Sequence, residues 1–254
     1  MATQLHDFDR TDAAEMTTRR DLAAFYRLVA YHGWDDLVAT HISARVPGRE
    51  TFLINPFGIL FEEITPDSLV EIDGDGNKVT ASPHGVNRAA FVIHSAVHAA
   101  RPEMQCVAHL HTKDGVAVSA LEEGLLPLNQ TSILLQGDVA IHEYEGVAVD
   151  LAERERLAAD LGTKNLMLLR NHGTLALGPT IADTFTSLYF LETACTTQVR
   201  TLSMGRPIHP VSAEVIAKVT SHRNAGGSAL AQNLVWPAML RKIQRLYPDF
   251  SIEG

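Results

Sequence analysis

The chain has 254 residues, which suits one large domain or two small ones, and 46% of them are hydrophobic, enough for a globular core. Its 30 acidic and 21 basic residues give a formal net charge of −9, so nucleic acid and anionic membranes are not expected partners. The sequence contains neither the apolar segment of a signal peptide nor an apolar run of ~18 residues. Cys106 and Cys195 are far apart, which favours reduced thiols in a cytoplasmic protein over a disulfide framework.

The first part of the chain predicts one long helix followed by short strands. Residues 1–10 are polar and are expected to form a flexible N-terminus, while Thr11 or Asp12 can cap a helix that ends at Gly33. Apolar residues recur every three or four positions along this helix, which gives it one buried face. Strands are expected at 38–46, 51–55, 69–72 and 78–80.

A second helix is expected over residues 87–100, and Pro102 ends its pattern. His94 and His98 are four residues apart on one face of this helix, a spacing at which two histidines can bind one metal ion. The glutamate that follows the first histidine in metalloprotease helices is missing here. A packing role for both side chains is therefore the preferred interpretation.

The rest of the chain alternates strands and helices. Strands are expected at 106–112, 126–135, 138–142, 165–172 and 173–178, and helices at 113–121, 150–161, 180–204, 212–219 and 229–246. No internal repeat or low-complexity linker divides the chain. The predicted organisation is one α/β domain over residues 11–208, with residues 209–254 as a helical C-terminal extension.

Histidines at the ends of two predicted strands form the most informative pattern. His109 and His111 are two residues apart, so their side chains point to the same side of a strand, and His172 ends another apolar strand. Three converging neutral imidazoles suit zinc first, with manganese, iron or cobalt as alternatives, and they leave coordination positions open. On spacing alone, a surface pair or a core histidine is the more common explanation of a His-x-His segment.

Several segments resemble the class II aldolase/adducin family. The matching segments are THISARV at 40–46, NPFG at 55–58, HSAVHAARP at 94–102, CVAHLHT at 106–112, HEYEG at 142–146 and RNHG at 170–173. Together they are specific, and the resemblance extends from about residue 19 to about residue 202.

The resemblance implies a three-layer α/β/α sandwich around a mainly antiparallel sheet, assembled as a homotetramer. It also implies a divalent metal ion held by three histidines, which correspond to His109, His111 and His172. The sugar-phosphate aldolases and epimerases of the family stabilise an enediolate on that metal. Adducin head domains keep the fold but are not known as aldolases.

The sequence departs from the aldolases where they transfer protons and bind phosphate. Their glutamate nineteen positions before the first metal histidine is replaced by Ala90, and their phosphate-binding Ser-Ser pair by Arg88 and Ala89. Their Gly-Asn-x-Ser loop reads Thr-His-Ile-Ser at 40–43, and their proton-donating tyrosine corresponds to Thr131. In these places the chain is more similar to adducin heads and to bacterial members that are not aldolases.

These features lead to the hypothesis of a divalent-metal-dependent lyase. Its substrate would be a small, non-phosphorylated hydroxy- or oxo-carboxylate, cleaved by retro-aldol reaction or decarboxylation with an enolate held on the metal. One alternative is a non-catalytic binding or scaffold protein of adducin type. Another is a non-haem iron oxygenase on the same fold, although such enzymes usually combine two histidines with one carboxylate.

Three residues are candidates for the pocket. Arg88 would pair with a substrate carboxylate in a two-point contact, although an exposed arginine in a first helical turn gives the same pattern. His41 is a candidate proton donor or a satisfied hydrogen-bonding side chain, and Thr131 occupies the tyrosine position. The substrate, the metal and the proton donor stay open at this point.

Overall fold

The computed structural model describes residues 2–146, 152–222 and 227–250, with the backbone alone for residues 2–12 and 88–90. A seven-stranded sheet in the order β3-β2-β1-β4-β7-β6-β5 forms its centre. Neighbouring strands are antiparallel except for β5 and β6, so the sheet is mainly antiparallel, as expected. The strands are β1 (His41–Arg45), β2 (Phe52–Ile54), β3 (Val70–Ile72), β4 (Cys106–Leu110), β5 (Val139–His142), β6 (Leu166–Leu169) and β7 (Gly173–Gly178).

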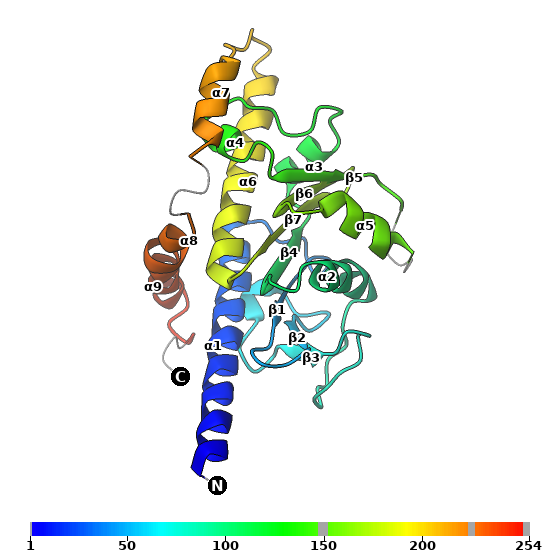
Figure 1. The fold of residues 1–254 in the computed structure, drawn as a ribbon, viewed down its shortest axis with the longest axis vertical. Coiled ribbons are helices and arrows are strands. Elements are labelled where there is room, and N and C mark those ends of the chain that lie inside the picture. Colours follow the sequence, from blue (N-terminus) through cyan, green and yellow to red (C-terminus); the bar gives the residue numbers. More distant parts are fainter. Residues whose placement is uncertain (1, 147–151, 223–226, 251–254) are drawn as a thin grey trace.

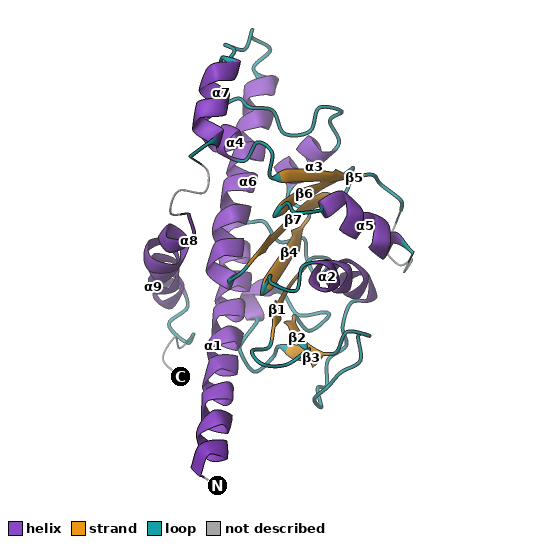
Figure 2. Ribbon diagram, in the orientation of Figure 1, coloured by secondary structure: helices purple, strands orange, loops and turns teal. Residues whose placement is uncertain are grey.

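Helices cover both faces of this sheet, and the expected three-layer sandwich is confirmed. Helices α1, α3 and α6 lie on one side, and α2 and α5 lie on the other (Figures 1 and 2). These helices are α1 (Ala2–His32), α2 (Arg88–Ala100), α3 (Lys113–Ser119), α5 (Glu153–Leu161) and α6 (Ile181–Ser203). None of the described helices has both the length and the apolarity needed to cross a bilayer.

The region after residue 209 is helical in most of its described part. It contains α7 (Ala213–Thr220), α8 (Gly227–Leu230), a π-helical turn (Ala231–Val235) and α9 (Trp236–Leu246). The π-helical turn packs against α6, and α9 packs against α1. The division into a domain and an extension at residue 209 remains a prediction.

The sheet separates two hydrophobic cores, because side chains alternate between its faces along each strand. In β4, Ala108 and Leu110 face a core built with α1 and α6. Val107, between Cys106 and Ala108, faces a second core built with α2 and α5. By the same alternation His109 belongs to the α2 side of the sheet.

The first helix begins earlier than its sequence pattern suggests. The sequence predicts a helix start at Thr11 or Asp12, whereas the backbone of α1 is helical from Ala2 onward, and the flexibility of residues 1–10 remains a prediction. Neither glycine nor proline occurs before Gly33, so no residue in this segment interrupts a helix.

The predicted strand at 126–135 is wrong. The centre of this segment forms the short helix α4 (Gln130–Leu134). The side chains of Asn129 and Ser132 stabilise its first turn. The Asn129 side chain accepts the backbone N–H of Ser132 at 2.8 Å, and the Ser132 hydroxyl accepts the N–H of Asn129 at 3.1 Å. This reciprocal capping determines the conformation, which a short apolar run cannot do alone.

At Gly173, where β7 begins, the backbone passes close to the end of β4. A Cβ atom at this residue would overlap the backbone carbonyl oxygen of Leu110. We therefore expect Gly173→Ala to lower the free energy of unfolding by roughly 2–4 kcal/mol, measured by urea denaturation. The control is Gly85→Ala, where a Cβ meets open space and where a change below about 1 kcal/mol is expected. Equal effects of the two substitutions would contradict the close approach.

Candidate metal centre

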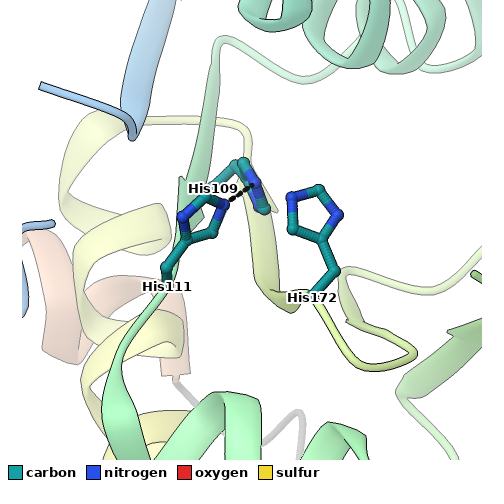
Figure 3. A group of neighbouring side chains, drawn as sticks. All are labelled: His109, His111 and His172. Atoms are coloured by element: carbon teal, nitrogen blue, oxygen red, sulfur yellow. Dashed lines mark hydrogen bonds between the residues drawn. The ribbon is translucent and has the colours of Figure 1, made fainter. Parts of the chain in front are cut away.

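Three histidines converge where β4 ends and β7 begins. His109 lies in β4, His111 follows the end of this strand, and His172 lies in the turn between β6 and β7. Because β4 and β7 pair antiparallel, with Leu110 opposite Thr174, the end of one strand lies beside the start of the other. One nitrogen from each of the three rings lies within 4.8 Å of the others (Figure 3).

The turn that carries His172 has an unusual backbone. Asn171 adopts a left-handed conformation, with φ of 53°, which asparagine tolerates better than most residues. The turn closes with a hydrogen bond of 3.1 Å from the His172 N–H to the Leu169 carbonyl. This geometry brings the His172 ring within 4.8 Å, centroid to centroid, of the His111 ring.

The hydrogen bonds of the two β4 histidines show which nitrogens are free to bind. His109 Nδ1 is 3.0 Å from the Thr174 carbonyl oxygen, and His111 Nδ1 is 3.0 Å from a carboxylate oxygen of Asp36. Both oxygens are acceptors, so in the neutral form of each ring Nδ1 carries the proton and Nε2 presents a lone pair.

These two lone pairs face each other across 3.0 Å. Two lone pairs repel at this distance unless a proton, as in the hydrogen bond drawn in Figure 3, or a metal ion lies between them. Two nitrogens bound at ~2.0–2.1 Å to one ion lie at a comparable separation. The donor set, its tautomers and its outer hydrogen bonds therefore fit a divalent metal ion held by His109, His111 and His172.

Burial favours the neutral form of His109 and His172, the form in which an imidazole binds a metal ion. The pKa of His109 is held well below its usual value, mainly by desolvation and further by the neighbouring histidines His41, His172 and His111. Desolvation, with the nearby His111 and His142, lowers the pKa of His172 to about 4.

His41 lies directly beside the three histidines. It pairs with His109 across β1 and β4, and the centroids of the two rings are 5.1 Å apart. The His41 side chain is buried, and its Nδ1 is 2.8 Å from Nε2 of His94 on α2. The structure thus brings this pocket candidate to the centre.

A buried polar chain continues from His41 between β1 and α2. The second ring nitrogen of His94 bonds to the Ser43 hydroxyl, which also lies 2.8 Å from Nε2 of His98. The His98 ring stacks on Phe52 with centroids 4.3 Å apart. His94 and His98 therefore pack and bond within the fold, in agreement with their preferred interpretation.

The other pocket candidates are placed differently. α2 begins at Arg88, but the side chains of Arg88 and Ala90 lie outside the described part of the chain. Thr131 lies in α4, which packs against α6 and α7. Among the described residues, no hydrogen bond or ring contact joins Thr131 to the three histidines.

Two carboxylates near the centre were not predicted from the sequence. Asp36 lies in the irregular segment after α1, and nothing in its spacing signals a contact with His111. Glu192 lies on the buried face of α6 with Leu188 and Cys195. Charged residues are rarely found at core positions of a helix. The spacing of Glu192 with Leu188 and Cys195 was therefore a signal in the sequence from which its role could have been predicted.

A mainly antiparallel α/β/α sandwich with three histidines gathered at its strand ends has the class II aldolase architecture. Residues 20–199 match the Class II Aldolase and Adducin N-terminal domain, so the chain belongs to the class II aldolase/adducin family.

Two solved structures and one sequence relative illustrate this membership. An aldolase II superfamily protein from Pseudomonas syringae is 48% identical, with a TM-score of 0.90 over 93% of this chain and 96% of that one. L-fuculose 1-phosphate aldolase from Glaciozyma antarctica is 29% identical, with a TM-score of 0.81 over 94% of this chain and 93% of that one. Alpha-adducin of Mus musculus is 43% identical over 82% of this chain, which matches 29% of the adducin.

Acid should destabilise the fold through the buried histidines. Burial, followed by the charge of Arg45, lowers the pKa of His98 to about 3, whereas an exposed histidine has a pKa near ~6.5. Below pH ~6.5 the unfolded chain binds a proton at this site that the folded chain does not bind. The contribution of His98 to the free energy of unfolding is therefore complete above pH ~6.5 and is lost as the pH falls toward 3. The loss between pH 7 and pH 5 is about 2 kcal/mol.

Substitution of His98 tests this pH dependence. The measurement compares chelator-treated wild type and His98→Gln. Between pH 7 and pH 5 the free energy of unfolding should decrease in both, and the decrease in His98→Gln should be smaller by about 2 kcal/mol. Urea denaturation at the two pH values measures the difference. His209→Gln is the control, because this side chain is exposed and should leave the pH dependence unchanged. Identical pH dependence in wild type and His98→Gln would count against the buried neutral state.

Proposed function

We propose that this protein is a divalent-metal-dependent carbon–carbon lyase acting on a small, non-phosphorylated hydroxy- or oxo-carboxylate. The reaction would be retro-aldol cleavage or decarboxylation. The supporting observation is the convergence of lone pairs from His109, His111 and His172, with two of the rings oriented by outer acceptors. Zinc is the first choice of ion, with manganese, iron and cobalt as alternatives.

The chain's own residues would prepare the site for this chemistry. Three neutral ligands leave open positions at which a bound divalent ion polarises an oxygen ligand and stabilises developing negative charge. Thr174 and Asp36 hold the tautomers of two ligands. The polar chain that starts at His41 borders the same centre, and His41 is the proposed proton-carrying group in place of the family glutamate.

The proposed substrate class follows from what the sequence carries in place of the phosphate site. Arg88 and Ala89 occupy the positions of the Ser-Ser pair, at the start of α2. A guanidinium there supports recognition of a carboxylate by two parallel hydrogen bonds.

An oligomer is part of this proposal. Two cavities of about 290 and 330 Å³ are lined by residues other than the three histidines, and the cavity beside His172 has only about 10 Å³. A neighbouring subunit of a homotetramer would complete the walls of the site. The proposed compartment is the cytoplasm.

A scaffold function is the second candidate. It is favoured by the 43% identity to mouse alpha-adducin over 82% of this chain, together with Ala90 and Thr131 at the aldolase glutamate and tyrosine positions. In that case the metal would be structural, and turnover would be absent.

Metal analysis is the primary test of the proposal. Protein purified without chelator should contain about one divalent ion per chain, and His109→Ala or His172→Ala should lose most of it, because two imidazoles rarely retain such an ion. Metal content would be measured by mass spectrometry, with His209→Ala as the matched exposed control. Wild-type protein that binds no divalent ion would refute the metal-dependent function.

A screen of hydroxy- and oxo-carboxylates with the loaded protein separates the candidate functions. Release of carbon dioxide or an aldehyde supports the lyase. Uptake of oxygen with ferrous iron would instead indicate an oxygenase. Bound metal without any turnover, and with oligomer assembly lost in His109→Ala, would indicate the scaffold.

Arg88→Ala tests the substrate class. Losing a charge-assisted contact with a carboxylate should raise KM by about 10–100-fold while kcat changes little. Steady-state kinetics on the best substrate from the screen measure both constants, and Arg88→Lys should recover part of the loss. An unchanged KM would remove the argument for a carboxylate.

A further inference from the structure

Glu192 is a buried carboxyl group in the helix that covers one face of the sheet. It lies on α6, and only 1% of its surface is exposed. Its neighbours along the same helix face, Leu188 and Cys195, belong to the hydrophobic core. A buried carboxyl group requires partners that compensate for its desolvation.

Two threonines supply these partners. The Thr174 hydroxyl donates to one carboxyl oxygen of Glu192 at 2.6 Å, and the Thr112 hydroxyl donates to the other. The Thr112 oxygen also accepts the Gly115 N–H at 3.0 Å, at the first turn of α3. Its hydroxyl proton is therefore directed to Glu192.

Both threonines belong to the segments that carry the candidate ligands. Thr112 directly follows His111, and Thr174 lies two residues after His172. The carbonyl oxygen of Thr174 is also the acceptor for Nδ1 of His109. One carboxyl group thus holds the end of β4 and the start of β7 in a fixed relation.

The space around this contact is filled. A Cβ atom at Gly115 would lie 2.5 Å from the Thr112 hydroxyl oxygen, 2.8 Å from Thr174 and 3.2 Å from Glu192. The carboxyl group and the two threonines therefore have little room to change position.

Charge gives the contact a second role. Imidazole is a neutral ligand, so three histidines would provide no negative charge to balance a divalent cation. Desolvation raises the pKa of Glu192 to about 7, against the opposing effect of the hydrogen bonds from Thr112 and Thr174. A divalent cation bound by His109 would favour the ionised carboxylate, because Thr174 bonds to both residues.

We propose that Glu192 is a positioning residue of the metal centre. Its carboxylate braces the ligand-bearing segments through Thr112 and Thr174 and supplies a buried negative charge that is linked through Thr174 to the candidate ligand His109. The inference rests on the metal centre of the proposed function.

The test is the zinc affinity of Glu192→Gln, measured by competition with a chelating indicator. An outer-shell change of this kind should weaken zinc binding by about 10–100-fold. The melting temperature of the chelator-treated protein should be unchanged or raised, because a buried amide avoids the desolvation of a carboxylate. A merely structural glutamate would give the reverse pattern, with a lower melting temperature and unchanged affinity.

Three further variants make the result specific. Thr174→Val removes the hydroxyl but keeps the carbonyl, so it should weaken zinc binding, and it should add little in the Glu192→Gln background. Thr174→Ser should restore the affinity. Asp183→Asn is the matched control, because this carboxylate on the same helix bonds to Thr180 and to neither Thr112 nor Thr174, and a change below about threefold is expected.

The outcomes separate the two proposals. A wild-type protein that binds no zinc or other divalent ion refutes the proposed function itself. If wild-type protein binds zinc and Glu192→Gln binds it with an affinity within about twofold of the wild type, only the positioning role of Glu192 is refuted. If Glu192→Gln does not fold, the test is Thr174→Val. A zinc affinity of this variant equal to that of the wild type refutes the positioning role of Glu192.

Discussion

The antiparallel pairing of β4 with β7 is the constraint on which the candidate site depends. It places Leu110 opposite Thr174, so histidines 63 residues apart in the chain, His109 and His172, meet at one end of the sheet. The alternation of side chains along β4 then assigns His109 to the face that α2 covers. The position of the histidines is thus a consequence of sheet register, and the helices contribute the groups that surround them.

Those surrounding groups turn a histidine cluster into a plausible ligand set. A backbone carbonyl and a carboxylate accept hydrogen bonds from His109 and His111, and burial lowers the pKa of His109. Ala90 stands where the aldolases of the family have their glutamate, while His94, one helical turn later on α2, bonds to His41 beside the centre. The chain therefore combines a family-like ligand set with a different polar environment, which is why its proposed chemistry differs from that of a sugar-phosphate aldolase.

The sequence predicted what depends on periodicity and missed what depends on tertiary contact. The shared side of His109 and His111 follows from the two-residue repeat of a strand, and His172 was found at the end of another apolar strand, with the RNHG segment of the family resemblance in support. The strand expected at 126–135 failed because the reciprocal capping of Asn129 and Ser132 overrides a short apolar run. Asp36 and Glu192 reach the centre from segments remote in sequence, and only the folded arrangement of α1 and α6 brings them there.

The two cores on opposite faces of the sheet differ in chemical kind. The core under α1 and α6 consists mainly of apolar side chains around the buried carboxyl group of Glu192, whereas the layer under α2 contains buried imidazoles that acid would protonate. Acid therefore acts on the two layers unequally. The α2 layer would open first, leaving α1, α6 and the strands they cover as a native-like remnant, so the sheet would act as the boundary between two cooperative unfolding units.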